Sequence, residues 1–177
     1  MTHLLAAIRC PDAGGDDLLA AVARVLQAQG LRLTGHVQRT FPDPSDACCE
    51  ITHVEDIQTG ARINITQALG AGSTGCRLDP AALAGVAGDL LVALDAVPDL
   101  VLVNRFGKGE AEGQGLRAVI ERAFAAGIPV LTLLRDSHAP AWEAFTGGEA
   151  ELLPADASAI LRWVQAAVAE ARRARAA

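Results

Sequence analysis

Aromatic residues are scarce in this sequence and make up only 3% of its 177 residues. Hydrophobic residues account for 51%, but much of that fraction is alanine. We therefore expect a core of Leu, Val, Ile and Ala packed between helices and a sheet. The length is close to that of one domain and suffices to bury such a core. Because no linker, internal repeat or low-complexity segment is visible, the sequence predicts a single α/β domain over residues 1–177.

Other features are also missing, and each absence argues against a class of protein. The net charge is −6, which argues against non-specific binding to nucleic acid or to an anionic membrane. No stretch approaches the roughly 18 apolar residues of a membrane span, and the apolar run before Arg9 is too short for a signal peptide. The four cysteines form no CxxC motif, and the histidines do not pair at metal-ligand spacing. We expect a cytoplasmic protein with reduced thiols, no nucleic-acid partner, no direct membrane insertion and no metal site.

Positive charge gathers at one place, the end of the sequence, where Arg172, Arg173 and Arg175 lie close together. These residues fall in the last turns of a predicted helix, where cations suit the helix macrodipole. We interpret the cluster as an ordinary helix end and not as a nucleic-acid patch.

Short apolar runs alternate with helical patterns along the chain. Leu4–Ile8 is continuously apolar, which is typical of a strand buried on both faces. Asp79 followed by Pro80 is a strong signal for the start of a helix. Strands are predicted at 4–8, 31–38, 48–54, 61–66, 99–103 and 128–134, with helices after 17, from 80, from 116, around 142–145 and from 156. The pattern predicts a three-layer α/β fold with a mostly parallel sheet, helices on both faces, and an antiparallel hairpin at 48–66.

In open α/β sheets, ligands gather outside the carboxyl ends of the strands. The first such loop stands where a phosphate-binding Walker A loop would be, with Gly14 and Gly15 for flexibility. Asp16 and Asp17 occupy the places of the lysine and the hydroxyl residue, so this is a degenerate Walker A motif, and standard P-loop hydrolysis is not expected. The alternative is a tight turn in which Asp16 caps the following helix.

Two further glycine-rich segments carry cations. The segment 104–115 follows the most buried strand and holds Arg105 and Lys108 among four glycines; cations and free backbone N–H groups at a helix start favour an anion. The segment 70–77 adds further polar groups, and each segment could instead be a plain surface connection. The candidate ligand-binding residues are the cations Arg77, Arg105 and Lys108, the neutral donors Gln38, Ser73, Thr74 and Asn104, and Arg9, Gly14, Gly15, Arg135 and His138 at the same strand ends.

Three stretches of this sequence are familiar: Gly35-His36-Val37-Gln38, Gly75-Cys76-Arg77-Leu78-Asp79 and Val103-Asn104-Arg105-Phe106-Gly107-Lys108. They resemble a bacterial domain-of-unknown-function family whose members are typically encoded beside the ATPase of molybdate ABC transporters. The order of the elements is also similar, more distantly, to the nucleoside-triphosphatase group of P-loop proteins. The missing lysine and hydroxyl depart from that group without affecting the expected fold.

Three functional hypotheses follow. The first is an accessory protein in molybdenum handling that binds an oxyanion, with molybdate or tungstate as the ligand that the resemblance implies. The second is a divergent nucleotide-binding protein or NTPase, in which Lys108 or Arg9 replaces the missing lysine. The third is an interaction module for a molybdate transporter ATPase or a molybdoenzyme assembly protein. The sequence contains no complete catalytic motif, and it leaves homo-oligomer formation open.

Overall fold

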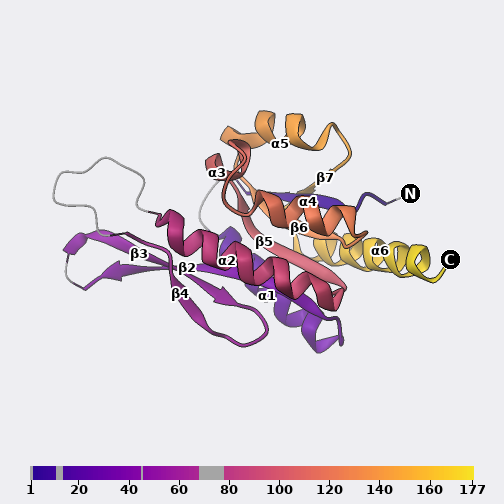
Figure 1. The fold of residues 1–177 in the computed structure, drawn as a ribbon, viewed down its shortest axis with the longest axis horizontal. Coiled ribbons are helices and arrows are strands. Elements are labelled where there is room, and N and C mark those ends of the chain that lie inside the picture. Colours follow the sequence, from indigo (N-terminus) through magenta and orange to yellow (C-terminus); the bar gives the residue numbers. More distant parts are fainter. Residues whose placement is uncertain (1, 11–13, 45, 68–77) are drawn as a thin grey trace.

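The computed structural model describes residues 2–10, 14–44, 46–67 and 78–177 (Figure 1). The strands are β1 (Leu5–Arg9), β2 (Leu33–Asp43), β3 (Asp46–Asp56), β4 (Arg62–Asn64), β5 (Leu100–Phe106), β6 (Val130–Leu134) and β7 (Glu151–Pro154). The helices are α1 (Gly15–Ala28), α2 (Pro80–Ala93), α3 (Lys108–Ala111), α4 (Arg117–Ala125), α5 (Ala139–Thr146) and α6 (Ala157–Ala176), with short 3₁₀ turns η1 (Leu94–Ala96) and η2 (Asp136–His138).

All seven strands form one sheet in the order β4-β3-β2-β5-β6-β1-β7. The five strands from β2 to β7 in this order pair in parallel, whereas β3 pairs antiparallel with both β2 and β4. The predicted mostly parallel sheet and the predicted hairpin are therefore confirmed. β7 was not predicted, and β2 extends five residues beyond the predicted strand end.

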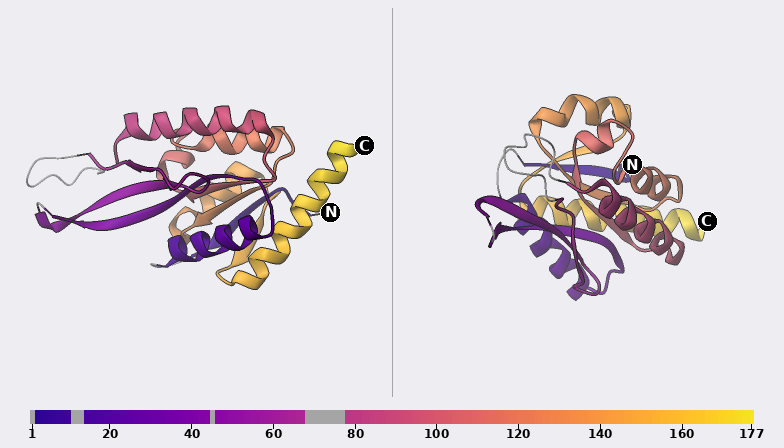
Figure 2. Two further views of the ribbon diagram at one scale, coloured as in Figure 1. Left: turned by 90° about the horizontal axis from the view of Figure 1, so that it is seen from below. Right: turned by 60° about the vertical axis from the view of Figure 1, so that its left-hand side comes forward.

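The alternation of side chains along each strand builds two hydrophobic layers. On β1, for example, Leu5 and Ala7 belong to one layer, and Ala6 and Ile8 belong to the other. α1 and α6 cover one face of the sheet, and α2, α4 and α5 cover the opposite face (Figure 2). This arrangement confirms the three-layer α/β architecture.

Three of the aromatic residues, Phe106, Trp142 and Phe145, form a cluster between α5 and the end of β5. The Trp142 ring lies edge-on to Phe106, with centroids 5.1 Å apart, and Phe145 stacks on Phe106 at 5.4 Å. Trp142 is only 1% exposed. The guanidinium of Arg117 lies 4.6 Å from the Phe145 ring centroid. The cluster fixes α4 and α5 against the end of β5, which is the strand that delivers the candidate site residues.

The outer parts of β2 and β3 form a two-stranded ribbon that extends away from the helices (Figure 2). β2 pairs with β5 only through Leu33–Gly35, and its remaining residues pair with β3 alone. Gly35 has φ of 143°, and a Cβ there would lie 2.1 Å from the Leu102 carbonyl oxygen. Glycine is therefore required where β2 approaches β5 and then leaves it.

Two of the helices begin after a capping aspartate at the start that the sequence predicts, and a third does not. The Asp79 carboxylate accepts hydrogen bonds from the N–H groups of Ala81 and Ala82, and Asp156 caps α6 in the same way. The prediction that Asp16 caps α1 is wrong, because Gly14 is the capping residue, with φ of 112° and no side-chain hydrogen bond. Asp16 is thereby available for another contact. None of the helices in the described ranges is both long and apolar enough to cross a membrane.

Candidate functional site

The carboxyl edge of the sheet brings together residues from α1, β2 and β5. Asn104 is 4% exposed and lies at the centre of this group. Its Oδ1 accepts a 2.7 Å hydrogen bond from the backbone N–H of Gln38, and its Nδ2 lies 3.3 Å from both Gln38 Oε1 and Asp16 Oδ1. Asn104 therefore ties two neighbouring strands to the first turn of α1. A buried amide with its groups paired in this way is rigid.

Arg105 follows Asn104 and places a cation beside the start of α1. Its Nη2 lies 3.2 Å from both carboxylate oxygens of Asp16, and both side chains are about a quarter exposed, at 27%. Arg105 Nε is buried and has no hydrogen-bond partner within the described ranges. Because a buried N–H without an acceptor is costly, this nitrogen is a donor to which an additional acceptor would be favourable.

The Asp16–Arg105 pair reverses the usual arrangement of a P-loop. In the sequence pattern, Asp16 stands where the P-loop lysine would be. Here the cation comes instead from the end of β5 and is held by the carboxylate at the helix start. This contact was not predicted from the sequence, because Asp16 and Arg105 lie 89 positions apart.

Two further ion pairs lie along the same edge. Arg9 Nε is 2.6 Å from Asp136 Oδ1, which connects the end of β1 to η2, and Arg39 Nη1 is 2.8 Å from Asp17 Oδ1. The hydrogen bond from Arg9 lowers the pKa of Asp136 below its usual value. Each of these pairs is solvent-exposed on at least one side, and such pairs contribute little to stability.

Arg135 and His138 flank the Arg9–Asp136 pair in the sequence. Arg135 is exposed, and His138, partly buried, is the last residue of η2 and directly precedes α5. The backbone N–H of His138 donates to the Arg135 carbonyl, which forms the η2 turn. The predicted convergence of strand ends thus consists of a cluster of Asp16, Gln38, Asn104 and Arg105, with separate pairs beside it.

The segment between β5 and α4 contains the short helix α3 and folds back on itself. Glu110 accepts hydrogen bonds from the backbone N–H groups of Gly107, at 3.0 Å, and Leu116, at 2.9 Å, and so closes the segment on itself. A Cβ at Gly115 would lie 2.3 Å from the same carboxylate. The sequence predicted free backbone N–H groups here for an anion. The Gly107 N–H is not free, because it donates to Glu110.

Lys108 lies on α3, and its Nζ is 3.8 Å from Glu112 on the same helix turn. Its side chain is 80% exposed. Within the described ranges, it has no contact with Asp16 or Asn104. The sequence places Lys108 beside Arg105, but the structure directs the two cations to different partners.

Gly14 is the capping residue of α1, and Gly15 is the first residue of the helix. A Cβ at Gly15 would lie 2.8 Å from Cys10 Sγ and 3.2 Å from Leu133 Cδ1, so this helix start packs tightly on β1 and β6. Ser73, Thr74 and Arg77 lie outside the described residues. In the described ranges, no three His, Cys, Asp or Glu side chains are grouped to hold a metal ion.

Comparison with known proteins identifies the family. Residues 4–163 match the family described as protein of unknown function DUF2478. The chain belongs to this family. It is also 40% identical over 149 residues to the molybdenum import ATP-binding protein ModC 2 of Bradyrhizobium diazoefficiens, an alignment that covers 84% of this chain and 16% of that protein. The chain thus spans about one sixth of the length of this curated relative.

A solved structure shows the same fold. The solution structure of a human cancer-related nucleoside triphosphatase superposes with a TM-score of 0.62 and 16% sequence identity, covering 87% of this chain and 88% of that one. The resemblance to the P-loop nucleoside triphosphatases is confirmed for the fold. The predicted resemblance to a domain-of-unknown-function family is confirmed by the family match.

Proposed function

We propose that this protein is an accessory protein of molybdenum handling that binds a tetrahedral oxyanion, molybdate or tungstate, at the carboxyl edge of its sheet. The observation that carries the proposal is Arg105, whose buried Nε has no acceptor within the described ranges while its Nη2 is held by Asp16. An oxyanion at this position would satisfy Nε and would also face the first turn of α1, where backbone dipoles favour negative charge.

The charge balance of the edge explains why a small anion fits better than a triphosphate. Arg9, Arg39 and Arg105 are each paired with an aspartate, so the edge is close to neutral. Asp16 and Asp17 lie where a P-loop would supply a lysine and a magnesium-binding hydroxyl. A triphosphate would lie against both carboxylates and needs several free cations, whereas a single oxyanion needs only one cation and a few neutral donors.

The neutral donors are already positioned. Gln38 and Asn104 are held against each other by two hydrogen bonds, of 2.7 and 3.3 Å, and Asn104 Nδ2 also lies 3.3 Å from Asp16 of the Asp16–Arg105 pair. Pre-positioned groups lower the entropic cost of binding. The choice of molybdate as the ligand is supported by the similarity to a molybdenum import ATP-binding protein.

Nucleotide binding is the second candidate, and the fold favours it. The strand order and the Gly14–Gly15 start of α1 are those of a phosphate-binding fold, and the superposed structure is a nucleoside triphosphatase. In this alternative, Arg105 supplies the cation that the P-loop lysine supplies elsewhere. Contact with a transporter ATPase is a third role, supported by the alignment with a segment of a longer ATP-binding protein.

Thermal unfolding of the purified protein tests these roles with molybdate, tungstate, sulfate, ATP and GTP, each with and without magnesium. A ligand at 100 times its Kd stabilises the fold by about 2.7 kcal/mol. We expect molybdate or tungstate to do so and sulfate to do so less. Stabilisation by a nucleotide alone would replace the oxyanion with the second candidate, and no response to any ligand would leave only the protein partner.

Two substitutions at the pair make the test specific. Arg105→Ala removes the cation and should abolish the shift. Asp16→Asn keeps the side-chain shape and releases Arg105 from its carboxylate, so anion binding should become tighter. Arg173→Ala is the matched control, because Arg173 pairs with Glu170 on α6 and its side chain is 73% exposed. Equal binding by Asp16→Asn, Arg105→Ala and wild type would contradict a role for this pair.

A further inference from the structure

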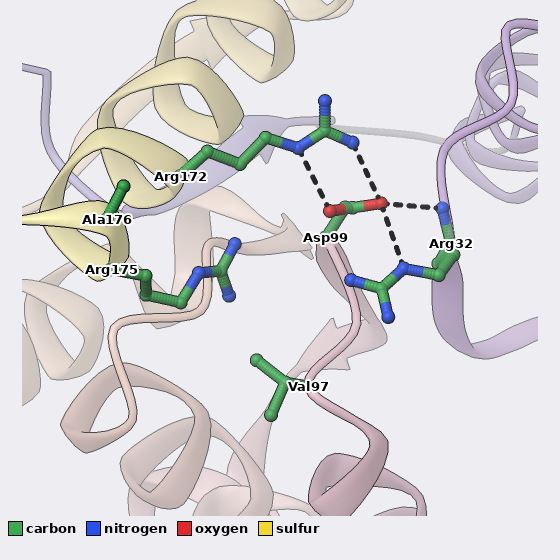
Figure 3. Close-up of a pocket in the computed structure, with 6 residues that line it drawn as sticks. All are labelled: Arg32, Val97, Asp99, Arg172, Arg175 and Ala176. Atoms are coloured by element: carbon green, nitrogen blue, oxygen red, sulfur yellow. Dashed lines mark hydrogen bonds and ion pairs between the residues drawn. The ribbon is translucent and has the colours of Figure 1, made fainter.

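A hollow on the opposite, amino edge of the sheet carries a concentration of positive charge that the proposed function does not use. It is lined by Arg32, Val97, Asp99, Arg172, Arg175 and Ala176 and has a volume of about 540 Å³ (Figure 3). These residues come from the segment before β2, the segment between η1 and β5, and the last turns of α6. They are therefore separated from the carboxyl edge by the length of β5.

The buried carboxylate of Asp99 organises the hollow. Its side chain is 3% exposed, and Oδ2 accepts from the backbone N–H of Arg32 at 2.9 Å, with Arg32 Nε at 3.5 Å. Arg172 approaches from the other side, with Nε at 3.2 Å from Oδ1 and Nη2 at 3.1 Å from Oδ2. Burial by itself would raise the pKa of Asp99, but the hydrogen bonds from Arg172 and Arg32 outweigh it and lower the pKa. Asp99 is therefore ionised at neutral pH and holds two guanidinium groups in place.

The charges of the hollow do not balance. Three guanidinium groups face one carboxylate, which leaves a formal charge of about +2 in a chain whose net charge is −6. Arg175 has no ion-pair partner within the described ranges. In Figure 3, its guanidinium points into the hollow and toward Arg32, and not back along the helix. The cluster thus differs from the simple helix end that the sequence suggested, in which cations only complement the macrodipole.

The backbone at the rim is also unusual. Val97 has φ of 49°, and within the described ranges no other residue apart from glycines has a positive φ. This conformation is unfavourable for a β-branched residue, and strained residues of this kind cluster at ligand sites. The Val97 side chain is 40% exposed and adds an apolar wall beside the guanidinium groups.

We propose that this hollow binds the phosphate group of a small soluble molecule between Arg32 and Arg175. Guanidinium groups match the geometry of phosphate oxygens and donate paired hydrogen bonds to them. A local charge of about +2 suits a phosphate dianion better than a single carboxylate. The hollow is open to solvent and has room for a phosphate with a modest organic group against Val97.

Calorimetric titration of the full chain with inorganic pyrophosphate at low ionic strength tests this site. Wild type should bind, and Arg175→Ala should bind at least about tenfold more weakly. Arg173→Ala is the matched control. It removes the same charge two residues from Arg175, and the Arg173 side chain pairs with Glu170 instead of facing the hollow. Arg175→Ala should keep the wild-type thermal response to molybdate, which separates this site from the carboxyl edge.

Three outcomes would overturn the proposal. The first is the absence of pyrophosphate binding by wild type, and the second is equal binding by Arg175→Ala and wild type. The third is an equal loss in Arg173→Ala and Arg175→Ala, because it would reflect only the general charge of α6. Arg175 is exposed, so its replacement should leave the thermal unfolding midpoint unchanged and the comparison valid.

Discussion

Asp99→Ala should destabilise the fold markedly, although Asp99 lies far from the candidate site. The substitution removes a carboxylate that is 3% exposed, that accepts hydrogen bonds from the Arg32 backbone and from the Arg172 guanidinium, and that forms an ion pair with the Arg32 guanidinium. Removing one partner of a buried ion pair typically costs about 3–5 kcal/mol. The side chains of Arg32 and Arg172 are more than half exposed, at 63% and 56%, so water can solvate them after the change.

The cost therefore falls mainly on the backbone N–H of Arg32, which loses its acceptor, and on the space left behind. An unsatisfied buried donor costs about 1–3 kcal/mol, so we expect Asp99→Ala to lower the free energy of unfolding by about 2–3 kcal/mol. Asp99→Asn keeps the volume and one acceptor oxygen and should cost about half as much. The β5 start and the end of α6 should loosen together in both variants, because Asp99 joins them.

Chemical denaturation followed by tryptophan fluorescence measures these values. Trp163 on α6 and Trp142 on α5 are both buried, at 4% and 1% exposure, so unfolding will change their emission. A destabilisation below about 1 kcal/mol for Asp99→Ala would refute the reasoning, since it would mean that the Arg32 N–H is satisfied without the carboxylate.

The pH dependence supplies an independent check on Asp99. Its pKa is lowered in the folded protein, so its stabilisation is complete above the unfolded pKa of about 3.9 and is lost as pH falls through the lower folded value. The difference in stability between wild type and Asp99→Asn should therefore be constant near neutral pH and should shrink only in acid. A difference that shrank between pH 7 and pH 5 would point to another titrating group.

Three further predictions concern other parts of the molecule. Burial lowers the pKa of His36 more than its acidic neighbours raise it, so the stability of the fold should fall as pH drops below about 6.5. His36→Asn should weaken this pH dependence, which denaturation measured between about pH 7 and pH 5 would show. A double-mutant cycle of Asp16→Ala and Arg105→Ala should give a coupling energy of about 1 kcal/mol or more, and additive effects would contradict a direct pair. Gly15→Ala should destabilise the protein by about 1–3 kcal/mol, because the new methyl would lie 2.8 Å from a cysteine sulfur. Gly88→Ala, in open space on α2, should stabilise the protein by up to about 1 kcal/mol. The order of the two thermal unfolding midpoints tests this.

The sequence predicted those elements whose signal is local. Leu100–Phe106 and Val130–Leu134 are nearly continuous apolar runs because both faces of these strands are buried, and Asp79 caps α2 as its position before a proline suggests. β7 gave no such signal, because it is a four-residue edge strand in which Leu152 is half exposed and only Leu153 is buried. The extension of β2 depends on its pairing with β3 and not on its own polar residues.

The candidate site was partly predictable for the same reason. Asn104 and Arg105 lie at the end of β5, and Gln38 follows the part of β2 that pairs with β5; the topology of a parallel sheet brings such residues to one edge. The role of Asp16 was not predictable, since its partner Arg105 lies 89 residues away and a helix-start aspartate normally caps the helix. The direction of Lys108 was also hidden, because it depends on how Glu110 closes the segment around α3.

The exchange of charge between α1 and β5 has a consequence for how this fold is used. A P-loop lysine belongs to the start of the helix and reaches the phosphates from there. Arg105 instead belongs to the sheet, and its partner Asp16 occupies the lysine position. Binding of any anion must then compete with Asp16 for the same guanidinium. Such a site favours ligands that gain from neutral donors and one shared cation, and it disfavours ligands that need several cations at once. If Asp16→Asn strengthens molybdate binding more than it strengthens ATP binding, this competition is what sets the preference of the edge for a small oxyanion; the opposite order would assign the edge to nucleotides.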